Sequence, residues 1–519
     1  MPIAIAQKTA DRAWIAVLAI GLPLLGALLM RTDGNWDLRN YHLYNTHAWL
    51  AGRTATDIAA AQLQTWHNPL LDLPFYLLVT SGLGLRWASL WLAVPCMASL
   101  FFLLRLQSRL SPEPVSRTSQ CVLAFLAITG AATYSTLGLS MNDAFVGAAM
   151  LCSLWLVIGC DAGRGEARAW LLAGVVAGAM AGLKLTAVVY CIGLAVTSLA
   201  AGAPAERIRR LGALAIGGIA GFLLTYGYWG WRLFATYGNP FFPYYNNLFH
   251  SPDALPADWA DARFRPHSLG DALLAPVHLL QRSQRYSEIF LSDPRLLLAI
   301  LSLGLLAWLH WKKRLAGRNE FALLLVFVLA SFLPWILQYG IYRYATVLEL
   351  LGCLALVLAL QRLPRARHVA MLLAALLVTA DTKRPNWGRI KATTPWYGVH
   401  SAPISDDSLV LLGSGEPLAY LALGLPTSVP LVRLAGNLMS PERCAGLQQR
   451  AAELIARQRG PIWLLSSDAA AGAEAQALLS KHYGLQASGA CLSYPSALDN
   501  ARLCPQRRLP ATTIACYRN

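Results

Sequence analysis

Charged side chains are scarce in this sequence. Of its 519 residues, only 13% are Asp, Glu, Lys or Arg, and 56% are hydrophobic. A soluble protein of this length would carry about a quarter charged residues, so much of the apolar surface is expected to face lipid. Acidic residues are fewer than basic residues, and the formal net charge is +16. The basic residues cluster in short runs between apolar segments, which is typical of cytoplasmic loops and argues against a nucleic-acid partner.

A signal-peptide cleavage motif is missing after the first apolar run, Trp14–Met30. We therefore expect this run to remain as an uncleaved first membrane helix. Internal repeats are also missing, which argues against a transporter built from inverted halves. Arg and Ala are common while Lys is rare, a composition that suggests a bacterial source.

The apolar runs predict a polytopic α-helical membrane protein with about eleven transmembrane helices. Arg- and Lys-rich turns between alternate runs place the N-terminus in the cytoplasm and the tail outside. We expect a membrane domain over residues 1–380 and a small extracytoplasmic α/β domain over residues 381–519. The predicted spans are Trp14–Met30, Arg86–Leu104, Cys121–Leu137, Ala144–Cys160, Trp170–Leu185, Ala187–Ala201, Leu211–Trp229, Leu296–Leu309, Phe321–Leu337, Ala345–Leu360 and Val369–Ala380.

One apolar run, His67–Gly84, is not counted as a span. It contains Pro69, Pro74 and Asp72, which disfavour a continuous helix in lipid. Counting it would also move the Arg-rich turns to the outer side. We expect this run to form a helix that lies at the outer membrane face.

The polar tail carries four cysteines, Cys444, Cys491, Cys504 and Cys516, whereas the other six lie in apolar runs. In an oxidising compartment these four would form two disulfides, and three pairings are possible. A zinc site is the alternative, but the spacings do not match a zinc motif.

The tail also alternates strand-like and helical patterns. "SLVLLGS" is followed by a helix near Pro417, and "PIWLLSS" is followed by a helix near Ala470. The segment between them, "SPERCAGLQQRAAELIARQRG", has a helical pattern. This alternation predicts a small α/β domain, in which the lone glycine turn "GSGEP" is too weak a pattern to indicate a phosphate site.

Ionisable residues from distant parts of the chain fall at the predicted outer face. Asp37 follows the first span, and Asp143 lies in a very short turn between two spans. Either carboxylate could simply cap the helix that follows it.

Two cations fall at the same face. Lys184 lies in an apolar run, where its side chain either reaches the interface or pairs with an acid. Arg343 stands between Tyr342 and Tyr344, which on their own would be interfacial aromatic residues. Carboxylates can move protons and cations can hold phosphate oxygens, so the combination suits a reaction on a lipid phosphate.

The order of these features resembles the GT-C superfamily of polytopic glycosyltransferases, which includes protein O-mannosyltransferases and the aminoarabinose transferase that modifies lipid A. In that superfamily the first outer loop begins with Asp or Glu four residues before a Tyr or its equivalent, and here Asp37 precedes Tyr41 by four. "WHNPLLDLPFYLL" takes the place of the superfamily's "KPPL" or "HPPL" helix, with Asn68 instead of the first proline. "MNDAF", "GLKLTA" and "YGNPFFPYYNNLF" are similar to other superfamily motifs, as is "YRYATVLEL", which lacks a proline.

The resemblance implies transfer of a sugar, with inversion, from a polyprenyl-phosphate donor to an extracytoplasmic acceptor, which is an envelope glycan, a lipid or a protein. Asp37 would be the general base that takes the proton from the acceptor hydroxyl. Asp143 would position the acceptor or the sugar. The implied location is a bacterial cytoplasmic membrane, with the active site outside the cytoplasm.

The resemblance also assigns the substrate-binding residues. Arg343 and Lys184 would neutralise the leaving phosphate, where negative charge grows as the glycosidic bond breaks. Tyr41, His67 and Tyr344 would line the pocket, and packing is the alternative role for each of them.

Other readings of the sequence stay open at this point. The rivals are a transporter or flippase for lipid-linked sugars, a glycan polymerase or ligase with the same chemistry, and a non-catalytic envelope scaffold. Polar residues at one face, and not at the midplane, favour the transferase over the transporter. No cofactor is required by this scheme, and a divalent metal ion held by the two acids is not excluded.

Overall fold

The computed structural model describes residues 2–111, 114–159, 164–200, 202–312, 320–363, 366–510 and 514–517. The chain forms two units, each assembled from separate stretches. Unit 1 comprises Met1–Met30, Leu92–Gly227 and Ala260–Trp387. Unit 2 comprises Arg31–Trp91, Tyr228–Trp259 and Gly388–Asn519. The predicted domain boundary at residue 380 stays a prediction.

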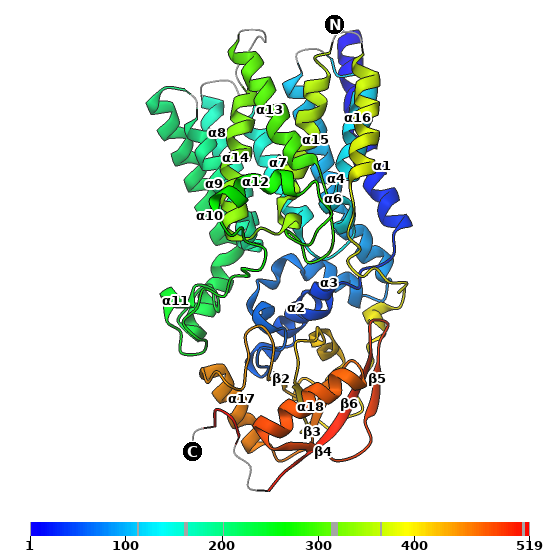
Figure 1. The fold of residues 1–519 in the computed structure, drawn as a ribbon, viewed down its shortest axis with the longest axis vertical. Helices are drawn as coiled ribbons and strands as arrows, with labels where there is room; N and C mark the ends of the chain where they lie inside the picture. Colours follow the sequence, from blue (N-terminus) through cyan, green and yellow to red (C-terminus); the bar gives the residue numbers. More distant parts are fainter. Residues whose placement is uncertain are drawn as a thin grey trace. The chain divides into compact units, whose positions relative to one another are not determined.

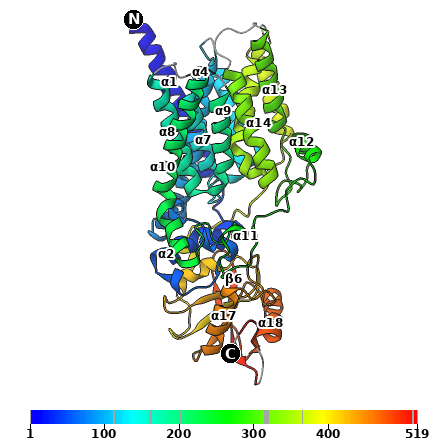
Figure 2. The same ribbon diagram turned by 90° about the vertical axis from the view of Figure 1, so that its left-hand side faces the viewer.

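Unit 1 is helical, and its long helices run side by side (Figures 1 and 2). The boundary between the two units falls within α4 and within α10, so each of these helices contributes residues to both units. The helices are α1 (Pro2–Leu29), α4 (Leu85–Leu110), α5 (Arg117–Ile128), α6 (Ala131–Thr136), α7 (Asp143–Val157), α8 (Arg164–Leu183), the 3-10 turn η5 (Leu185–Ala187), α9 (Val188–Leu199), α10 (Pro204–Tyr237), α12 (Leu269–His278), α13 (Arg295–Trp311), α14 (Glu320–Gln338), the 3-10 turn η6 (Tyr342–Ala345), α15 (Thr346–Leu360) and α16 (Arg367–Asp381).

Several of these helices are suited to a membrane, as predicted. Among the described residues, six are long and apolar enough to cross one: Arg12–Leu29, Leu85–Leu110, Gly165–Leu183, Pro204–Tyr237, Glu320–Gln338 and Tyr342–Leu360. Four further apolar helices are shorter: Arg117–Ile128, Asp143–Val157, Leu185–Leu199 and Arg295–Trp311. The chain is thus a multi-pass membrane protein, while the full count of about eleven crossings stays a prediction.

The predicted span Cys121–Leu137 is not one continuous helix. It consists of α5 and the short α6, with a break at Thr129 and Gly130. A Cβ on Gly130 would collide with the carboxylate of Glu349, so any larger residue at the break would force that side chain to shift. The sequence pattern is apolar on both sides of the break and therefore does not reveal it.

Helices α8 and α10 touch backbone to backbone. Gly174, Gly178 and Gly182 recur every fourth residue of α8 and so form one face of the helix. A Cβ on Gly178 would collide with the carbonyl group of Gly218 on α10, and a Cβ on Gly221 would collide with the α8 backbone. Such small-residue faces let helices approach closely inside a membrane.

Unit 2 contains the segment after the first span, the segment after α10 and the tail. Its elements are the π-helix η1 (Leu38–His42), α2 (Leu43–Leu50), the 3-10 turns η2 (Arg53–Ala55), η3 (Gln62–Trp66) and η4 (Pro69–Leu71), α3 (Leu73–Thr80), α11 (Asn246–Phe249), the 3-10 turn η7 (Pro395–Gly398), β1 (Leu409–Leu412), the 3-10 helix η8 (Ala419–Gly424), β2 (Leu431–Arg433), α17 (Gly446–Arg457), β3 (Ile462–Ser466), α18 (Ala469–Tyr483), β4 (Leu485–Ala487), β5 (Leu492–Pro495) and β6 (Asn500–Arg508). The uncounted run His67–Gly84 forms only η4 and the eight-residue α3, which is too short to span a bilayer.

The tail forms a mixed six-stranded sheet in the order β2-β1-β3-β6-β4, with β5 paired to β6. β1 pairs in parallel with β2 and β3, while β6 is antiparallel to β3, β4 and β5. The predicted strands β1 and β3 and the predicted helices α17 and α18 are confirmed. The helix expected near Pro417 is instead the 3-10 helix η8, and the antiparallel part of the sheet was not predicted.

A buried ion pair fastens the segment after the first span to the tail within unit 2. Arg53 pairs with Asp57 at 3.0 Å and donates hydrogen bonds to the carbonyl groups of Pro426 and Val429. Asp57 in turn accepts a hydrogen bond from the backbone N–H of Leu431. Burial raises the pKa of the Asp57 carboxyl, and the Arg53 guanidinium opposes that rise. These bonds hold the early segment against β2 despite the long stretch of chain between them.

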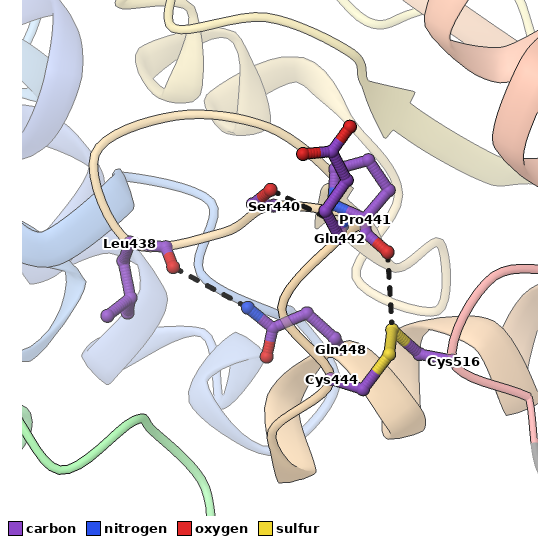
Figure 3. Close-up of a disulfide and its surroundings, with 7 residues drawn as sticks. All are labelled: Leu438, Ser440, Pro441, Glu442, Cys444, Gln448 and Cys516. Atoms are coloured by element: carbon purple, nitrogen blue, oxygen red, sulfur yellow. Dashed lines mark hydrogen bonds between the residues drawn. A yellow bond between two sulfur atoms is a disulfide. The ribbon is translucent and has the colours of Figure 1, made fainter.

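The four tail cysteines form two disulfides, so they are not zinc ligands. Cys491 pairs with Cys504, thirteen residues later, and Cys444 pairs with Cys516, at a separation of 72. Figure 3 shows the second bond at the start of α17, where the Sγ of Cys516 also lies 3.5 Å from the Pro441 carbonyl oxygen. Cys160 and most of the predicted cytoplasmic turn 312–320 lie outside the described residues.

The close packing of α8 on α10 gives a stability prediction. Gly178→Ala should lower the free energy of unfolding by about 1–3 kcal/mol, because its methyl group must push the two backbones apart. The measurement is thermal unfolding in detergent, followed by tryptophan fluorescence. Gly304→Ala in α13 is the matched control: nothing lies within 4 Å of its Cβ position, so it should leave stability unchanged or raise it. Equal effects of the two substitutions would contradict the proposed packing.

Candidate functional site

The residues singled out in the sequence fall in both units. Asp143, Lys184, Arg343 and Tyr344 belong to unit 1. Asp37, Tyr41 and His67 belong to unit 2.

In unit 1 the Asp143 carboxylate binds two cations. One oxygen lies 2.6 Å from the Nζ of Lys184, and the other lies 3.4 Å from a guanidinium nitrogen of Arg343. Lys184 also donates a hydrogen bond to the Met141 carbonyl oxygen. Because Lys184 is paired in this way, its position in an apolar run is explained by an ion pair and does not require its side chain to reach the interface.

Irregular backbone brings these three side chains together. Asp143 is the first residue of α7 and follows Asn142, which adopts the left-handed conformation. Lys184 has extended backbone angles between the end of α8 and η5. Arg343 lies in η6, which is held by a hydrogen bond from the Tyr190 hydroxyl to the Tyr344 carbonyl oxygen at 2.5 Å. The helices are therefore interrupted where the charges meet.

Aromatic rings and a second acid surround Arg343. Its guanidinium lies 4.9 Å from the Tyr344 ring and 5.7 Å from the Trp387 ring, distances that suit cation–π contacts. Glu288 approaches the guanidinium at 3.4 Å. Lys184 lies 5.4 Å from the Tyr344 ring, so this tyrosine contacts both cations.

The cluster is largely removed from solvent. Asp143 is 2% exposed and Arg343 is 8% exposed. Buried ions are costly unless they are paired, and inside a membrane bundle they mark functional positions by default. The two cations and the carboxylates of Asp143 and Glu288 balance in formal charge, which offsets part of that cost.

A second buried carboxylate, Glu349, holds the turn before α6. It accepts hydrogen bonds from the backbone N–H groups of Ala132 and Thr133, at 2.7 and 2.9 Å, and from the Thr133 hydroxyl at 2.6 Å. Asp293 similarly accepts from the Ala131 N–H at 2.7 Å. Both acids thus bind the first amide groups of α6, a short helix that precedes the Asn142–Asp143 turn.

In unit 2, Asp37 immediately precedes the π-helix η1 and is 8% exposed. Its side chain makes no capping hydrogen bond to that helix. Asn35 has this role instead, since its side-chain oxygen accepts from the Leu38 N–H at 2.7 Å. Asp33 accepts a hydrogen bond from the Asn35 N–H, so the turn before η1 is built by these two residues.

Aromatic and imidazole rings follow Asp37 along η1. The Tyr41 ring lies 4.0 Å from the His42 ring and meets the His67 ring edge-on at 5.2 Å. His67 Nε2 lies 2.9 Å from the hydroxyl of Tyr244, a residue of the "YGNPFFPYYNNLF" motif. His42 Nδ1 lies 2.9 Å from both carboxylate oxygens of Asp72. Tyr41 and His67 therefore lie together in unit 2, although sequence separates them.

Sequence reasoning missed several members of these groups. Glu288 lies in a polar loop where nothing distinguishes it from neighbouring charges, and Trp387 follows the last helix as an ordinary aromatic residue. Asp72 was noted only as an obstacle to a span. Asp72 within the apolar run His67–Gly84 was the one signal that a buried partner such as His42 had to exist.

A metal site does not emerge from the side chains whose positions the structure gives. Within the described ranges, no group of three or more His, Cys, Asp or Glu residues is arranged to hold a metal ion. The use of a metal stays an open expectation.

No family model and no curated protein matches the chain. Two solved structures are similar to it. The oligosaccharyltransferase of Archaeoglobus fulgidus, solved with zinc and sulfate, is 13% identical with a TM-score of 0.45, and the alignment covers 88% of this chain and 67% of that protein. The arabinofuranosyltransferase AftD from mycobacteria is 16% identical with a TM-score of 0.48, and the alignment covers 95% of this chain but only 40% of AftD.

Both similarities are at low sequence identity, so neither transfers a residue role, a substrate or an activity to this chain.

The shared carboxylate predicts unequal effects for its partners. Asp143→Asn removes the charge that pairs with both cations and should destabilise the protein by about 3–5 kcal/mol. Lys184→Met should cost less, because Asp143 keeps its contact with Arg343. Thermal unfolding of the two single variants and the double variant forms a double-mutant cycle. The double variant should be more stable than Asp143→Asn alone, and strict additivity would contradict the ion pair.

Proposed function

We propose that this protein is an inverting glycosyltransferase of a bacterial cytoplasmic membrane. It transfers a sugar from a polyprenyl-phosphate donor to an acceptor outside the cytoplasm. The observation that carries the proposal is the buried cluster of Asp143, Lys184 and Arg343. Two cations held by one carboxylate among membrane helices are the chemistry that a departing lipid phosphate requires, because its negative charge grows as the glycosidic bond breaks.

Arg343 is the cation best suited to bind the phosphate. Its contacts to Asp143 and Glu288 are both 3.4 Å, whereas charge-assisted hydrogen bonds are commonly about 2.7–2.9 Å. Lys184 is held more tightly, at 2.6 Å from Asp143. A phosphate oxygen that replaces the Glu288 carboxylate would restore short contacts to the guanidinium fork and keep the charges balanced.

Glu288 is the carboxylate that can yield its place. Its side chain is 27% exposed, compared with 2% for Asp143. It belongs to the segment between α12 and α13, outside any helix. In the resting enzyme the Glu288 carboxylate contacts the Arg343 guanidinium. In the proposed reaction the donor phosphate displaces this carboxylate.

Asp37 is the general base in this proposal. Its ionised carboxylate takes the proton of the acceptor hydroxyl while the hydroxyl oxygen bonds to the anomeric carbon. The bond between that carbon and the phosphate oxygen breaks at the same time, and the phosphate leaves with the bonding electrons. Attack from the side opposite the leaving group inverts the anomeric configuration.

The ring cluster of Tyr41, His67 and Tyr244 suits a sugar or acceptor site. Flat aromatic faces bind the apolar face of a sugar ring, while the Tyr244 hydroxyl and the His67 imidazole offer polar contacts. The disulfides of the tail support an extracytoplasmic position for that domain, because such bonds persist in oxidising compartments.

Asp37→Asn tests the assignment of the base. Purified protein is incubated with a panel of polyprenyl-phosphate sugars and candidate acceptors, and the release of free polyprenyl phosphate is measured. The substitution should lower kcat by about 10²–10⁴-fold, since it removes proton transfer from an intact fold. Asp406→Asn, on an exposed residue of the tail, is the control and should be fully active. Full activity of Asp37→Asn would show that another group is the base.

Substitutions of Arg343 and Glu288 should change the KM for the lipid donor in opposite directions. Arg343→Gln should raise the KM for the lipid donor and lower kcat, because the guanidinium contacts the phosphate both before and during bond breaking. Glu288→Gln should lower the KM, because the competing carboxylate is gone. The same release assay measures both. A Glu288→Gln enzyme with a raised KM would contradict the displacement of Glu288 by phosphate.

A further inference from the structure

Unit 1 contains a basic hollow of about 510 Å³ at the C-terminal end of α16. Three cations line it, Arg282, Lys383 and Arg384, together with the rings of Tyr134 and Phe290. The described lining includes no carboxylate. The hollow is therefore a concentration of positive charge without a matching acid in its wall.

The contacts of these cations leave their charges available to a ligand. Arg384 donates a hydrogen bond to the Thr129 carbonyl oxygen at 2.9 Å and lies 5.2 Å from the Tyr134 ring. Arg282 lies 5.7 Å from the Phe290 ring. Among the described residues, the Lys383 ammonium donates its one side-chain hydrogen bond to the Ala380 carbonyl oxygen, at 3.4 Å. Carbonyl oxygens and aromatic rings orient a cation but do not neutralise it. A bound anion could therefore interact with the charges of all three side chains.

The helix that leads to the hollow, α16, has an apolar face that is exposed in the part of the chain that the structure describes. Leu373, Leu376 and Leu377 of α16 are 54%, 63% and 71% exposed. The opposite side of α16 is buried and packs against α5 and α15, and Figure 1 shows α16 beside α15. Exposed leucines on a helix of a membrane protein are suited to lipid chains. Basic and aromatic side chains at the end of such a helix are suited to the headgroup level.

We propose that this hollow binds the phosphate of an anionic membrane lipid whose chains lie along the exposed leucines of α16. The ligand class is a phosphate ester attached to long apolar chains, which includes phosphatidylglycerol and polyprenyl phosphate. Arg282 and Lys383 bind the phosphate oxygens from the exposed side, and Arg384 binds them from its anchored position above Tyr134. This site is distinct from the Asp143 cluster, and its occupation does not depend on sugar transfer.

Lipid binding to the purified full-length protein in detergent tests the proposal. The melting temperature is followed while phosphatidylglycerol, polyprenyl phosphate, phosphatidylcholine or inorganic phosphate is added. The double variant Arg282→Gln/Lys383→Gln should bind the phosphate lipids about thirtyfold more weakly, from the usual contribution of a basic residue near a lipid surface. Both side chains are exposed and neither makes an ion pair in the described structure, so the variant should keep the lipid-free melting temperature.

The matched control removes the same charge elsewhere in unit 1. Arg263 and Arg285 are exposed as well, but they are paired with Asp261 and Asp271. The variant Arg263→Gln/Arg285→Gln should therefore bind the phosphate lipids like the parent protein. Binding of either phosphate lipid with this pattern supports the proposal.

Four results would overturn it. These are parent-like affinity in the Arg282/Lys383 variant, equal losses in both variants, binding of phosphatidylcholine as tight as that of the phosphate lipids, and stabilisation by inorganic phosphate alone that equals stabilisation by the lipids. The assay needs no activity. A protein that binds lipid here but transfers no sugar would contradict the proposed function and leave this site intact.

Discussion

The carboxylate of Asp143 sets the local geometry of unit 1, because it must satisfy Lys184 and Arg343 at once. Each of the three side chains comes from a place where a helix is interrupted, by a left-handed residue, by an extended residue or by a 3-10 turn. Irregular backbone inside a membrane bundle is tolerated only where protein groups satisfy its polar atoms. The charges and the interruptions therefore depend on each other.

The turn before α6 is a second place where buried charges satisfy irregular backbone, and here the charges are the carboxylates of Glu349 and Asp293. Their carboxylates receive the first amide groups of that helix, which lipid could not satisfy. Gly130 leaves the room that Glu349 needs. The short α6 then leads into the turn that presents Asp143. Buried acids thus support the cluster by fixing the backbone around it, while the cations of the cluster are the groups that we propose to bind the donor phosphate.

The sequence predicts the helices well because long apolar runs leave few alternatives in a membrane. It also predicts β1, β3, α17 and α18 in the tail, where the period of the apolar residues changes between strands and helices. The break at Gly130 was not predictable, because its cause is Glu349, which is remote in sequence. The same holds for the role of Glu288. The pairing of the tail cysteines was open for a related reason, since spacing alone does not report which strands lie side by side.

Asp37, Asp143, Lys184 and Arg343 were identifiable because charged residues are rare within the apolar runs and at their outer ends. Their partners were less visible. From the sequence, the Lys184 side chain could have extended to the membrane interface without a partner. Only the three-dimensional arrangement shows that it forms an ion pair with Asp143. The roles proposed for Asp37, Tyr41 and His67 rest on their chemistry and on their placement within unit 2.

The backbone contact between α8 and α10 has a mechanical consequence. Side chains that interdigitate can change rotamer and absorb a small shift, but Gly178 against Gly218 offers no such layer. We therefore expect the two helices to move together as one rigid pair. Lys184 directly follows the last residue of α8, so the position of this cation is tied to that rigid pair of helices.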